Sequence, residues 1–248
     1  PSLYAAIYMS DPRPAEQQII QKLRYYDPAI ADHVEFMSRA YFYLSIDPAG
    51  TARKHSNKSG FLYAALGDVT GPGPDGELRT EKRLRILDAK GILATMHDLK
   101  DRMVSYCIQR SVHFIATETA GLGLAMPDMI RNSFPGIEPI ECPPGNKSKE
   151  IRLRQVGVLI DDTRPSADFG GAVVEFPGVK CGGLDRLRPD PNLGWFYEQI
   201  LRFGATSEDD CLDALTQLVG AAPAARPKRC RKSANTRWAC NGTWPNTS

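Results

Sequence analysis

Two apolar runs in this sequence each end on a carboxylate that is followed within a few residues by glycine. The run "YFYLSID" ends on Asp47 shortly before Gly50, and the run "VHFIATE" ends on Glu118 shortly before Gly121. Apolar runs of this length, bounded by turn residues, are typical of buried strands. In open α/β sheets the ligand crevice lies beyond the carboxyl ends of the strands. We therefore expect a functional site where these two strands end.

The predicted elements follow an order typical of an α/β domain with a mixed sheet. An antiparallel meander is predicted from three strands: the first run "YFYLSID", then "SGFLYAALGDV", then "KRLRILDAKG". The last two pair with each other because the Gly- and Pro-rich "TGPGPDGE" between them demands a loop. Helices and strands then alternate, and the first helix crosses over to the second buried run. The later helices are predicted in "TMHDLKDRMVSYCIQR", "LAMPDMIRNSF", "SKEIRLRQVGVLI", "GWFYEQILRFG" and "SEDDCLDALTQLVGAA", and the later strands in "IEPIECPP" and, at an edge, "AVVEFPG".

Composition and charge divide the chain into three parts. The 248 residues are 42% hydrophobic and 24% charged, which is enough to bury a sizeable core. We interpret residues 1–39 as a lead-in with helices over 14–26 and 29–39, and residues 40–222 as the main domain. Residues 223–248 hold six basic residues and no acid, whereas the rest carries 25 basic and 29 acidic residues. This Pro-rich, aperiodic tail predicts disorder, with nonspecific contact to a polyanion as the alternative.

The sequence lacks the features of secreted and membrane-spanning proteins. It has no run of 18 apolar residues and no basic-then-apolar start. We expect a cytoplasmic protein with no membrane partner. The six cysteines show no C-x-x-C spacing, so neither a disulfide framework nor a zinc finger is expected.

The positions of Asp47 and Glu118 imply a divalent cation. A meander followed by a right-handed crossover can place the fourth strand beside the first, and the two acids then lie side by side. Two neighbouring carboxylates repel one another unless a divalent cation neutralises them. The alternative for each acid taken alone is a capping or turn role.

A third group of acids lies in "SEDDCLDAL", at the start of a predicted helix. Asp209, Asp210 and Asp213 share one side of its first turns. Complementation of the helix dipole explains Asp209 and Asp210, but not Asp213 further inside. Because first-turn residues project toward the expected crevice, we rank Asp210 first as a ligand, Asp213 second and Asp209 third. Together the acids suit two Mg²⁺ or Mn²⁺ ions, which clamp the attacking and leaving oxygens in phosphodiester hydrolysis.

Four separated segments resemble the motifs of a known family. They are "SIDPAG", "ATETAGLG", "GNKSKEIRLRQVGVLIDD" and "SEDDCLDAL", in this order. They resemble the C-terminal nuclease domain of the large terminase subunit of tailed bacteriophages, over residues 40–220. The resemblance implies a ribonuclease H-like fold, with a mixed five-stranded sheet and flanking helices. It also implies an endonuclease that cuts concatemeric double-stranded viral DNA during packaging in the bacterial host, with portal protein and the small terminase subunit as candidate partners.

The motifs assign roles to the acids and to a basic helix start. By resemblance, Asp47 matches the first catalytic acid, Glu118 the second, and the acids of "SEDDCLDAL" the third motif. The segment "KSKEIRL" matches a basic helix start, and we predict that it contacts DNA phosphates without reading bases, with a solvated helix face as the alternative. The residues predicted to bind DNA are Lys147, Lys149, Arg152 and Arg154.

The chain also departs from the family pattern. Glu208 stands where the family often has a histidine before the Asp pair, which leaves open which acid of the third motif binds metal. No G-x-x-x-x-G-K-[ST] motif is present, so the ATPase of full-length large terminases is absent. We expect a chain that does not translocate DNA by itself, either an excised domain or the product of a truncated gene.

Two alternatives to the packaging endonuclease stay open. One is a non-catalytic docking or DNA-binding remnant of a packaging motor, and the other is a different ribonuclease H-like nuclease such as a junction resolvase. The presence of all the acids favours the endonuclease.

Two further patterns predict structure alone. Asp161 and Asp162 predict a turn after a helix. Trp195, Phe196, Ile200 and Phe203 recur at helical spacing, which favours core packing over a base-stacking surface.

Overall fold

The computed structural model describes seven segments of the chain. They are residues 18–49, 58–72, 76–143, 145–163, 173–180, 187–204 and 210–222. The predicted tail, and the part of the lead-in before residue 18, lie outside the described residues. The division of the chain into lead-in, domain and tail therefore stays a prediction.

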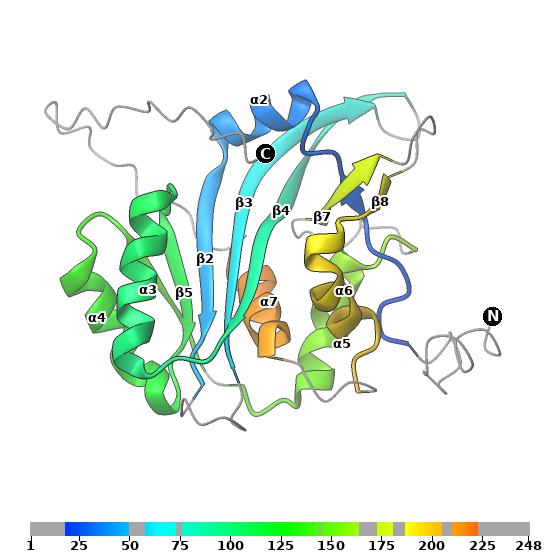
Figure 1. The fold of residues 1–248 in the computed structure, drawn as a ribbon. Helices are drawn as coiled ribbons and strands as arrows, with labels where there is room; N and C mark the ends of the chain where they lie inside the picture. The colour runs from blue at the N-terminus through cyan, green and yellow to red at the C-terminus, as the bar shows by residue number, and fades with distance from the viewer. Residues whose placement is uncertain are drawn as a thin grey trace, which may run out of the picture.

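One mixed sheet forms the centre of the molecule (Figure 1). Its strands lie in the order β1-β7-β4-β3-β2-β5-β6, with β8 paired to β7. Strands β2 (Tyr41–Asp47), β3 (Ser59–Pro72) and β4 (Leu78–Ile92) form the antiparallel meander expected from the sequence. Strands β5 (Phe114–Glu118) and β6 (Glu138–Cys142) continue the sheet parallel to β2. These five strands have the order and directions of the predicted ribonuclease H-like sheet.

The other half of the sheet corrects two predictions. Strand β7 (Val173–Lys180) is not at an edge, because it pairs in parallel with both β4 and the short β1 (Tyr25–Tyr26). Strand β8 (Leu187–Pro189) pairs with it antiparallel. The helix predicted over 14–26 is also wrong within its described part, since residues 18–26 form extended chain that ends in β1.

The wrong helix has a physical explanation. Ile19, Ile20 and Leu23 have the spacing of a helix face, and all three are buried. They enter the core from an extended chain because this segment pairs with its neighbours instead of with itself. The backbone N–H of Phe176 donates to the carbonyl of Arg24 at 2.8 Å.

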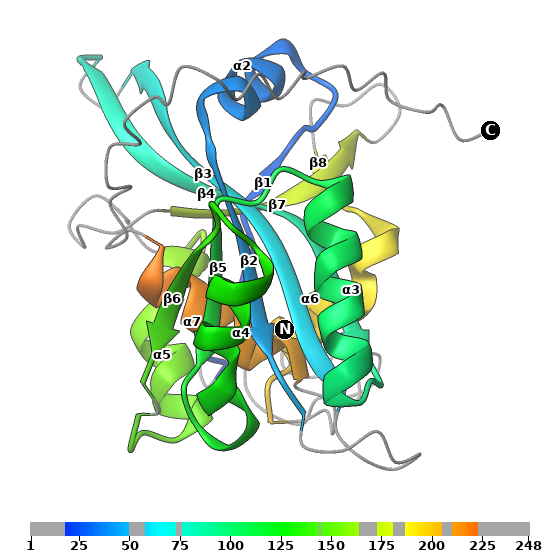
Figure 2. The ribbon, with the colours of Figure 1, turned by 90° about the vertical axis from the view of Figure 1, so that its left-hand side faces the viewer.

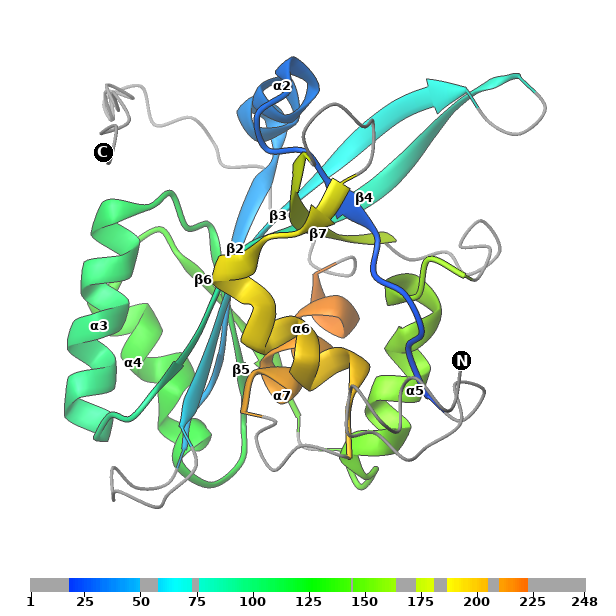
Figure 3. The same cartoon turned by 45° about the vertical axis from the view of Figure 1, so that its right-hand side comes forward.

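Helices cover both faces of the sheet (Figures 1 and 2). Helices α3 (Met96–Gln109) and α4 (Met126–Ser133), the latter entered through the 3₁₀ turn η2 (Gly121–Ala125), pack on one face. The other face carries α5 (Lys149–Ile160), α6 (Gly194–Leu201) after the turn η3 (Pro191–Leu193), and α7 (Asp210–Ala221). Figure 3 shows α6 lying in front of α7. Helix α2 (Ala31–Arg39) confirms the predicted second helix of the lead-in.

Helix α7 is the most deeply buried helix on its face. Its predicted apolar stripe is confirmed, since Leu212, Leu215 and Val219 are 0 to 2% exposed. At its C-terminal end, the Tyr43 hydroxyl in β2 donates to the carbonyl of Ala222 at 3.4 Å. This contact holds the end of α7 against β2.

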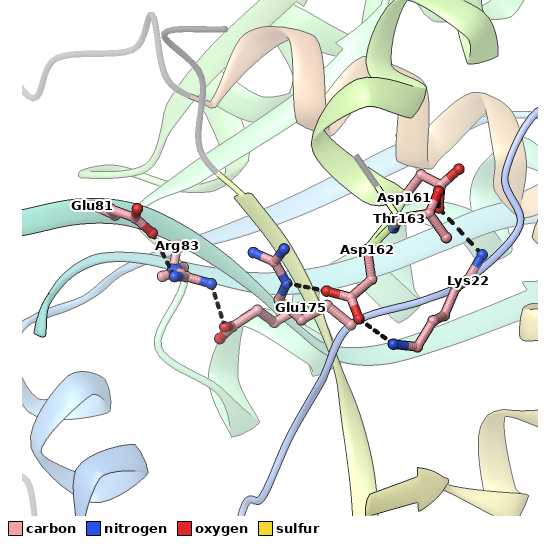
Figure 4. Close-up of polar contacts among 8 residues, drawn as sticks. Lys22, Glu81, Arg83, Asp161, Asp162, Thr163 and Glu175 are labelled. Atoms are coloured by element: carbon pink, nitrogen blue, oxygen red, sulfur yellow. Dashed lines mark hydrogen bonds and ion pairs between the residues drawn. The ribbon is translucent and has the colours of Figure 1, made fainter. Parts of the chain in front are cut away.

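Polar links attach the N-terminal segment and β7 to the rest of the fold (Figure 4). The carboxylate of Asp161 accepts from the backbone N–H groups of Gln21 and Lys22 at 3.2 and 3.3 Å. Asp162 pairs with Lys22 at 2.7 Å and with Arg24 at 2.8 Å. The turn predicted at these two aspartates is confirmed, and it also holds the incoming chain against the end of α5.

Charged pairs likewise connect β7 to β4. Glu175 binds Arg83 and Arg85, each at 2.9 Å. Arg85 is only 6% exposed and also lies over the rings of Phe36 and Tyr26. A guanidinium paired and stacked in this way is suited to burial.

No described helix is long and apolar enough to cross a membrane. The three cysteines within the described residues, Cys107, Cys142 and Cys211, form no disulfide.

Candidate active site

Parallel pairing of β2 and β5 places Asp47 beside Glu118. In this ladder Ile46 lies opposite Thr117, so the next residues, Asp47 and Glu118, lie level with each other where the strands end. Neighbouring strands are about 4.8 Å apart. The sequence prediction that these two acids lie side by side is therefore met by the strand register.

Both acids face the same side of the sheet. Leu44, Ile46 and Ile115 belong to the core beneath α3 and α4. Successive residues of a strand point to opposite faces. Asp47 and Glu118 therefore face the side covered by α5 and α7.

Helix α7 brings a third acid to this place. Cys211, two residues before Asp213, donates from its thiol to the carbonyl of Lys90 in β4 at 3.4 Å. Lys90 pairs with Phe61, which pairs with Ile46 of β2, so this part of α7 lies over the strand ends next to Asp47. The charge of Asp213 raises the pKa of Asp47, which shows that the two carboxylates are close together. Asp213 is 6% exposed, so its carboxylate is held between helix and sheet.

The electrostatics of Asp47 show that the three acids share one field. The pKa of Asp47 is raised from 3.8 to about 7, first by burial and then by the charges of Asp213 and Glu118. The cations Lys149 and Arg152 act in the opposite direction and offset only part of this shift. The ionised site therefore carries negative charge that the described side chains do not fully neutralise.

Helix α5 supplies the two cations. The Ser148 side chain caps its first turn by accepting from the backbone N–H of Ile151 at 3.3 Å. Lys149 and Arg152, three residues apart, then share a side of the helix. Their side chains bind the Asp213 carboxylate at 3.0 and 2.8 Å.

This arrangement changes how the predicted DNA-binding residues are interpreted. Lys149 and Arg152 contact the acid site directly, and Arg154 pairs with Glu150 on the exposed side of α5 at 2.9 Å. Lys147 lines a groove beside Glu118. Contact of these four residues with DNA stays a prediction.

The ranking of the third-motif acids also changes. Asp213 is close enough to Asp47 for its charge to raise the pKa of that group. Asp210, ranked first from the sequence, is the first residue of the helix, and its side chain is outside the described part of the structure. Asp209 lies outside the described residues altogether. The geometry therefore favours Asp213, whose side chain is buried and whose charge acts on Asp47.

The glycines after Glu118 fold the chain back onto the strand end. Gly121 has φ +52°, a left-handed conformation that favours glycine. A Cβ at Gly123 would lie 1.8 Å from the carbonyl oxygen of Glu118, so only glycine fits there. The motif "ATETAGLG" thus positions the second acid and packs the following turn tightly against it.

The donor set suits a hard divalent cation. Among the described residues, no group of three or more His, Cys, Asp or Glu side chains lies close enough together to hold a metal ion. Asp47, Glu118 and Asp213 nonetheless offer only carboxylate oxygens, which Mg²⁺ and Mn²⁺ prefer. In this structure Lys149 and Arg152 supply the positive charge next to Asp213, while the raised pKa of Asp47 marks where a cation would be favourable.

A groove of about 820 Å³ opens beside Glu118, between β6, α5 and α7. Gln217 lines it and is 8% exposed, and neither atom of its amide has a hydrogen-bond partner among the described residues. It lies four residues after Asp213, on the same side of α7. The sequence carried no signal for this residue, because a glutamine in an apolar helix has no motif of its own.

Comparisons with known proteins give one distant structural neighbour. No protein-family model and no curated protein matches the chain. Among solved structures, the chain is similar to the large terminase nuclease from thermophilic phage G20c, with bound zinc. The identity is 15%, the TM-score is 0.41, and the match covers 78% of this chain and 82% of that chain. The fold is defined by the strand order and directions described above.

Asp213→Asn tests the third acid. We expect about a hundredfold or greater loss of single-turnover plasmid cleavage, since the change removes a carboxylate and leaves two cations facing Asp47. Asp162→Asn is the control, because its carboxylate pairs with Lys22 and Arg24 at the end of α5. Cleavage at the wild-type rate by Asp213→Asn would exclude this residue from the site.

Proposed function

We propose that this chain is a divalent-metal-dependent endonuclease that hydrolyses phosphodiester bonds of double-stranded DNA. The observation that carries the proposal is the register of β2 and β5, which brings Asp47 and Glu118 together at the strand ends with Asp213 facing them. Buried acids with strongly perturbed pKa values are typical of functional sites. Asp47, Glu118 and Asp213 would hold Mg²⁺ or Mn²⁺, and the bound ions would supply charge stabilisation to phosphodiester hydrolysis.

The side chains of the site have separate roles in this proposal. Asp47 and Glu118 would bind the divalent cations at the strand ends. Their positions are fixed by the pairing of β2 with β5. Lys149 and Arg152 keep two cations within reach of the same place. Such cations bind phosphate oxygens as readily as carboxylates, so they orient the backbone of a bound strand. Asp213 keeps both of them near the acids until substrate enters.

The biological setting in the proposal comes from the sequence motifs. The substrate is concatemeric viral DNA, cut during packaging in the cytoplasm of the bacterial host. Portal protein and the small terminase subunit are the proposed partners.

A non-catalytic docking module is the competing function, and the electrostatics count against it. A raised pKa means that the folded protein disfavours the charged form of Asp47. An asparagine of the same shape would remove this cost. The acid is therefore better explained by chemistry than by docking.

Cleavage of supercoiled plasmid tests the proposal. We expect nicked and linear products with Mg²⁺ or Mn²⁺, and none when EDTA is present, because the site needs the cation for its chemistry. A junction resolvase would instead cut a four-way junction in preference to plasmid. Plasmid cleavage that is unaffected by EDTA, or the lack of any cleavage with either metal, would contradict the proposed function.

A further inference from the structure

A second groove, of about 490 Å³, lies along the end of β4 between α3 and α6. Three of the residues that line it are basic, and no acid is among the described lining residues. The basic residues are Lys58, Lys90 and Arg102. A concave surface lined by positive charges attracts a polyanion.

The groove lies at the same edge of the sheet as the acid site. Asp47 pairs with Gly60 of β3, and Gly60 pairs with Gly91 of β4, so Gly91 is level with Asp47 two strands away. Two strand spacings amount to about 10 Å. A DNA strand spans this separation in a few nucleotides.

The side chains at the groove are arranged around the end of β4. A Cβ at Gly91 would lie 3.2 Å from Cδ of Lys58, so the lysine stem crosses the strand there. Lys90 pairs with Asp88 at 3.4 Å and lies 5.5 Å from the centre of the Tyr106 ring. The Cys211 thiol in α7 donates to the carbonyl of Lys90 at 3.4 Å, which connects the groove to the helix that carries Asp213.

Trp195 adds an aromatic surface to this basic groove. It is 38% exposed although its neighbours Phe196 and Ile200 are buried, so the core packing predicted from the sequence holds for them and only in part for Trp195. Gln199 lies one turn along α6 from Trp195, is 4% exposed, and its Oε1 has no hydrogen-bond partner among the described residues. The groove therefore combines cations, an indole face and a buried acceptor.

We propose that this groove binds an unpaired stretch of DNA strand a few nucleotides from the cut. The cations contact its phosphates, and Trp195 stacks on a base. Stacking requires an accessible base face, which duplex DNA does not offer. The inference rests on the proposed nuclease function, since the acid site defines the position of the cut.

Binding of labelled oligonucleotides to the full chain in EDTA tests the groove without cleavage. The probes are a short single strand, a duplex with an unpaired flap, and a blunt duplex of the same sequence. The variants are the triple substitution Lys58→Gln, Lys90→Gln, Arg102→Gln, and separately Trp195→Leu. The control is Lys82→Gln, an exposed lysine near the opposite end of the same strand.

We expect the triple variant to bind the single strand and the flap at least about tenfold more weakly. Its slope of log affinity against log salt should fall by about two, since each lost phosphate contact in a single strand removes about 0.7. Trp195→Leu should weaken the same two probes by about fivefold or more. Neither variant should change blunt-duplex binding by more than about twofold, and Lys82→Gln should match wild type throughout.

Two results would overturn the inference. One is single-strand affinity and salt slope in the triple variant equal to wild type, with Trp195→Leu equally unaffected. The other is the same loss on blunt duplex as on the flap, which would make the groove a duplex contact. Failure of the nuclease function is separately visible, because it abolishes metal-dependent cleavage in wild type while leaving these binding differences in place.

Discussion

Asp47→Asn is expected to lower the single-turnover rate of plasmid cleavage by about a thousandfold or more. The change removes a negative charge at the centre of the site and keeps the shape of the side chain. Charge stabilisation by bound metal is worth several kcal/mol in such reactions, and each 1.4 kcal/mol or so is a factor of ten in rate. The rate is measured at several Mn²⁺ concentrations, with circular dichroism to confirm folding.

Asp68→Asn is the matched control for this experiment. Asp68 is an exposed aspartate on β3, eight residues beyond Gly60, the partner of Asp47. It should cleave at the wild-type rate. Equal rates for Asp47→Asn and wild type would remove Asp47 from the site and with it the basis of the proposed function.

Asp47→Asn is also expected to stabilise the metal-free protein. The pKa of Asp47 is 3.8 as a free group and about 7 in the fold, so the folded state holds its proton more tightly than the unfolded chain. Below pH 3.8 both states are protonated and the site costs nothing. As the pH rises from 3.8 to 7, the unfolded chain loses this proton first, so the free energy of unfolding falls. Above pH 7 the folded protein carries the full cost of the charged Asp47.

Asp47→Asn removes that penalty. Above pH 7 in EDTA, we expect the free energy of unfolding to rise by about 1–4 kcal/mol, and near pH 4 the difference should nearly vanish. Mg²⁺ should stabilise wild type more than the variant, because only wild type has the full charge to neutralise. Urea denaturation at both pH values measures this. Equal stability of the two proteins across the range would show that Asp47 is not strained by its neighbours.

The acid pair was predictable because it depends on chain order and local pattern. Asp47 and Glu118 end two recognisable strands, and a meander followed by a right-handed crossover allows few strand orders. The position of Asp213 was harder to predict, because it depends on how deeply α7 packs against the sheet. That depth is set by contacts such as Tyr43 with Ala222, which are far apart in sequence.

Other features of the site could not be derived from the sequence at all. The pairing of Lys149 and Arg152 with Asp213 joins two helices that are distant in the chain. The basic groove likewise draws its residues from β4, α3, α6 and the residue before β3, none with a motif. Conversely, the segment 14–26 was predicted as a helix, although its buried residues Ile19 and Ile20 lie in extended chain. Periodicity cannot distinguish a helix face from extended chain that enters a core.

The central claim is that Asp47 and Glu118 together hold a divalent cation, and calorimetric titration with Mn²⁺ tests it most directly. The comparison is between wild type, the double variant Asp47→Asn, Glu118→Gln, and Asp68→Asn. We expect wild type and Asp68→Asn to bind Mn²⁺ alike, and the double variant to bind it at least about a hundredfold more weakly, because two carboxylate ligands are lost. Mn²⁺ binding of the same affinity and stoichiometry in the double variant would contradict the claim.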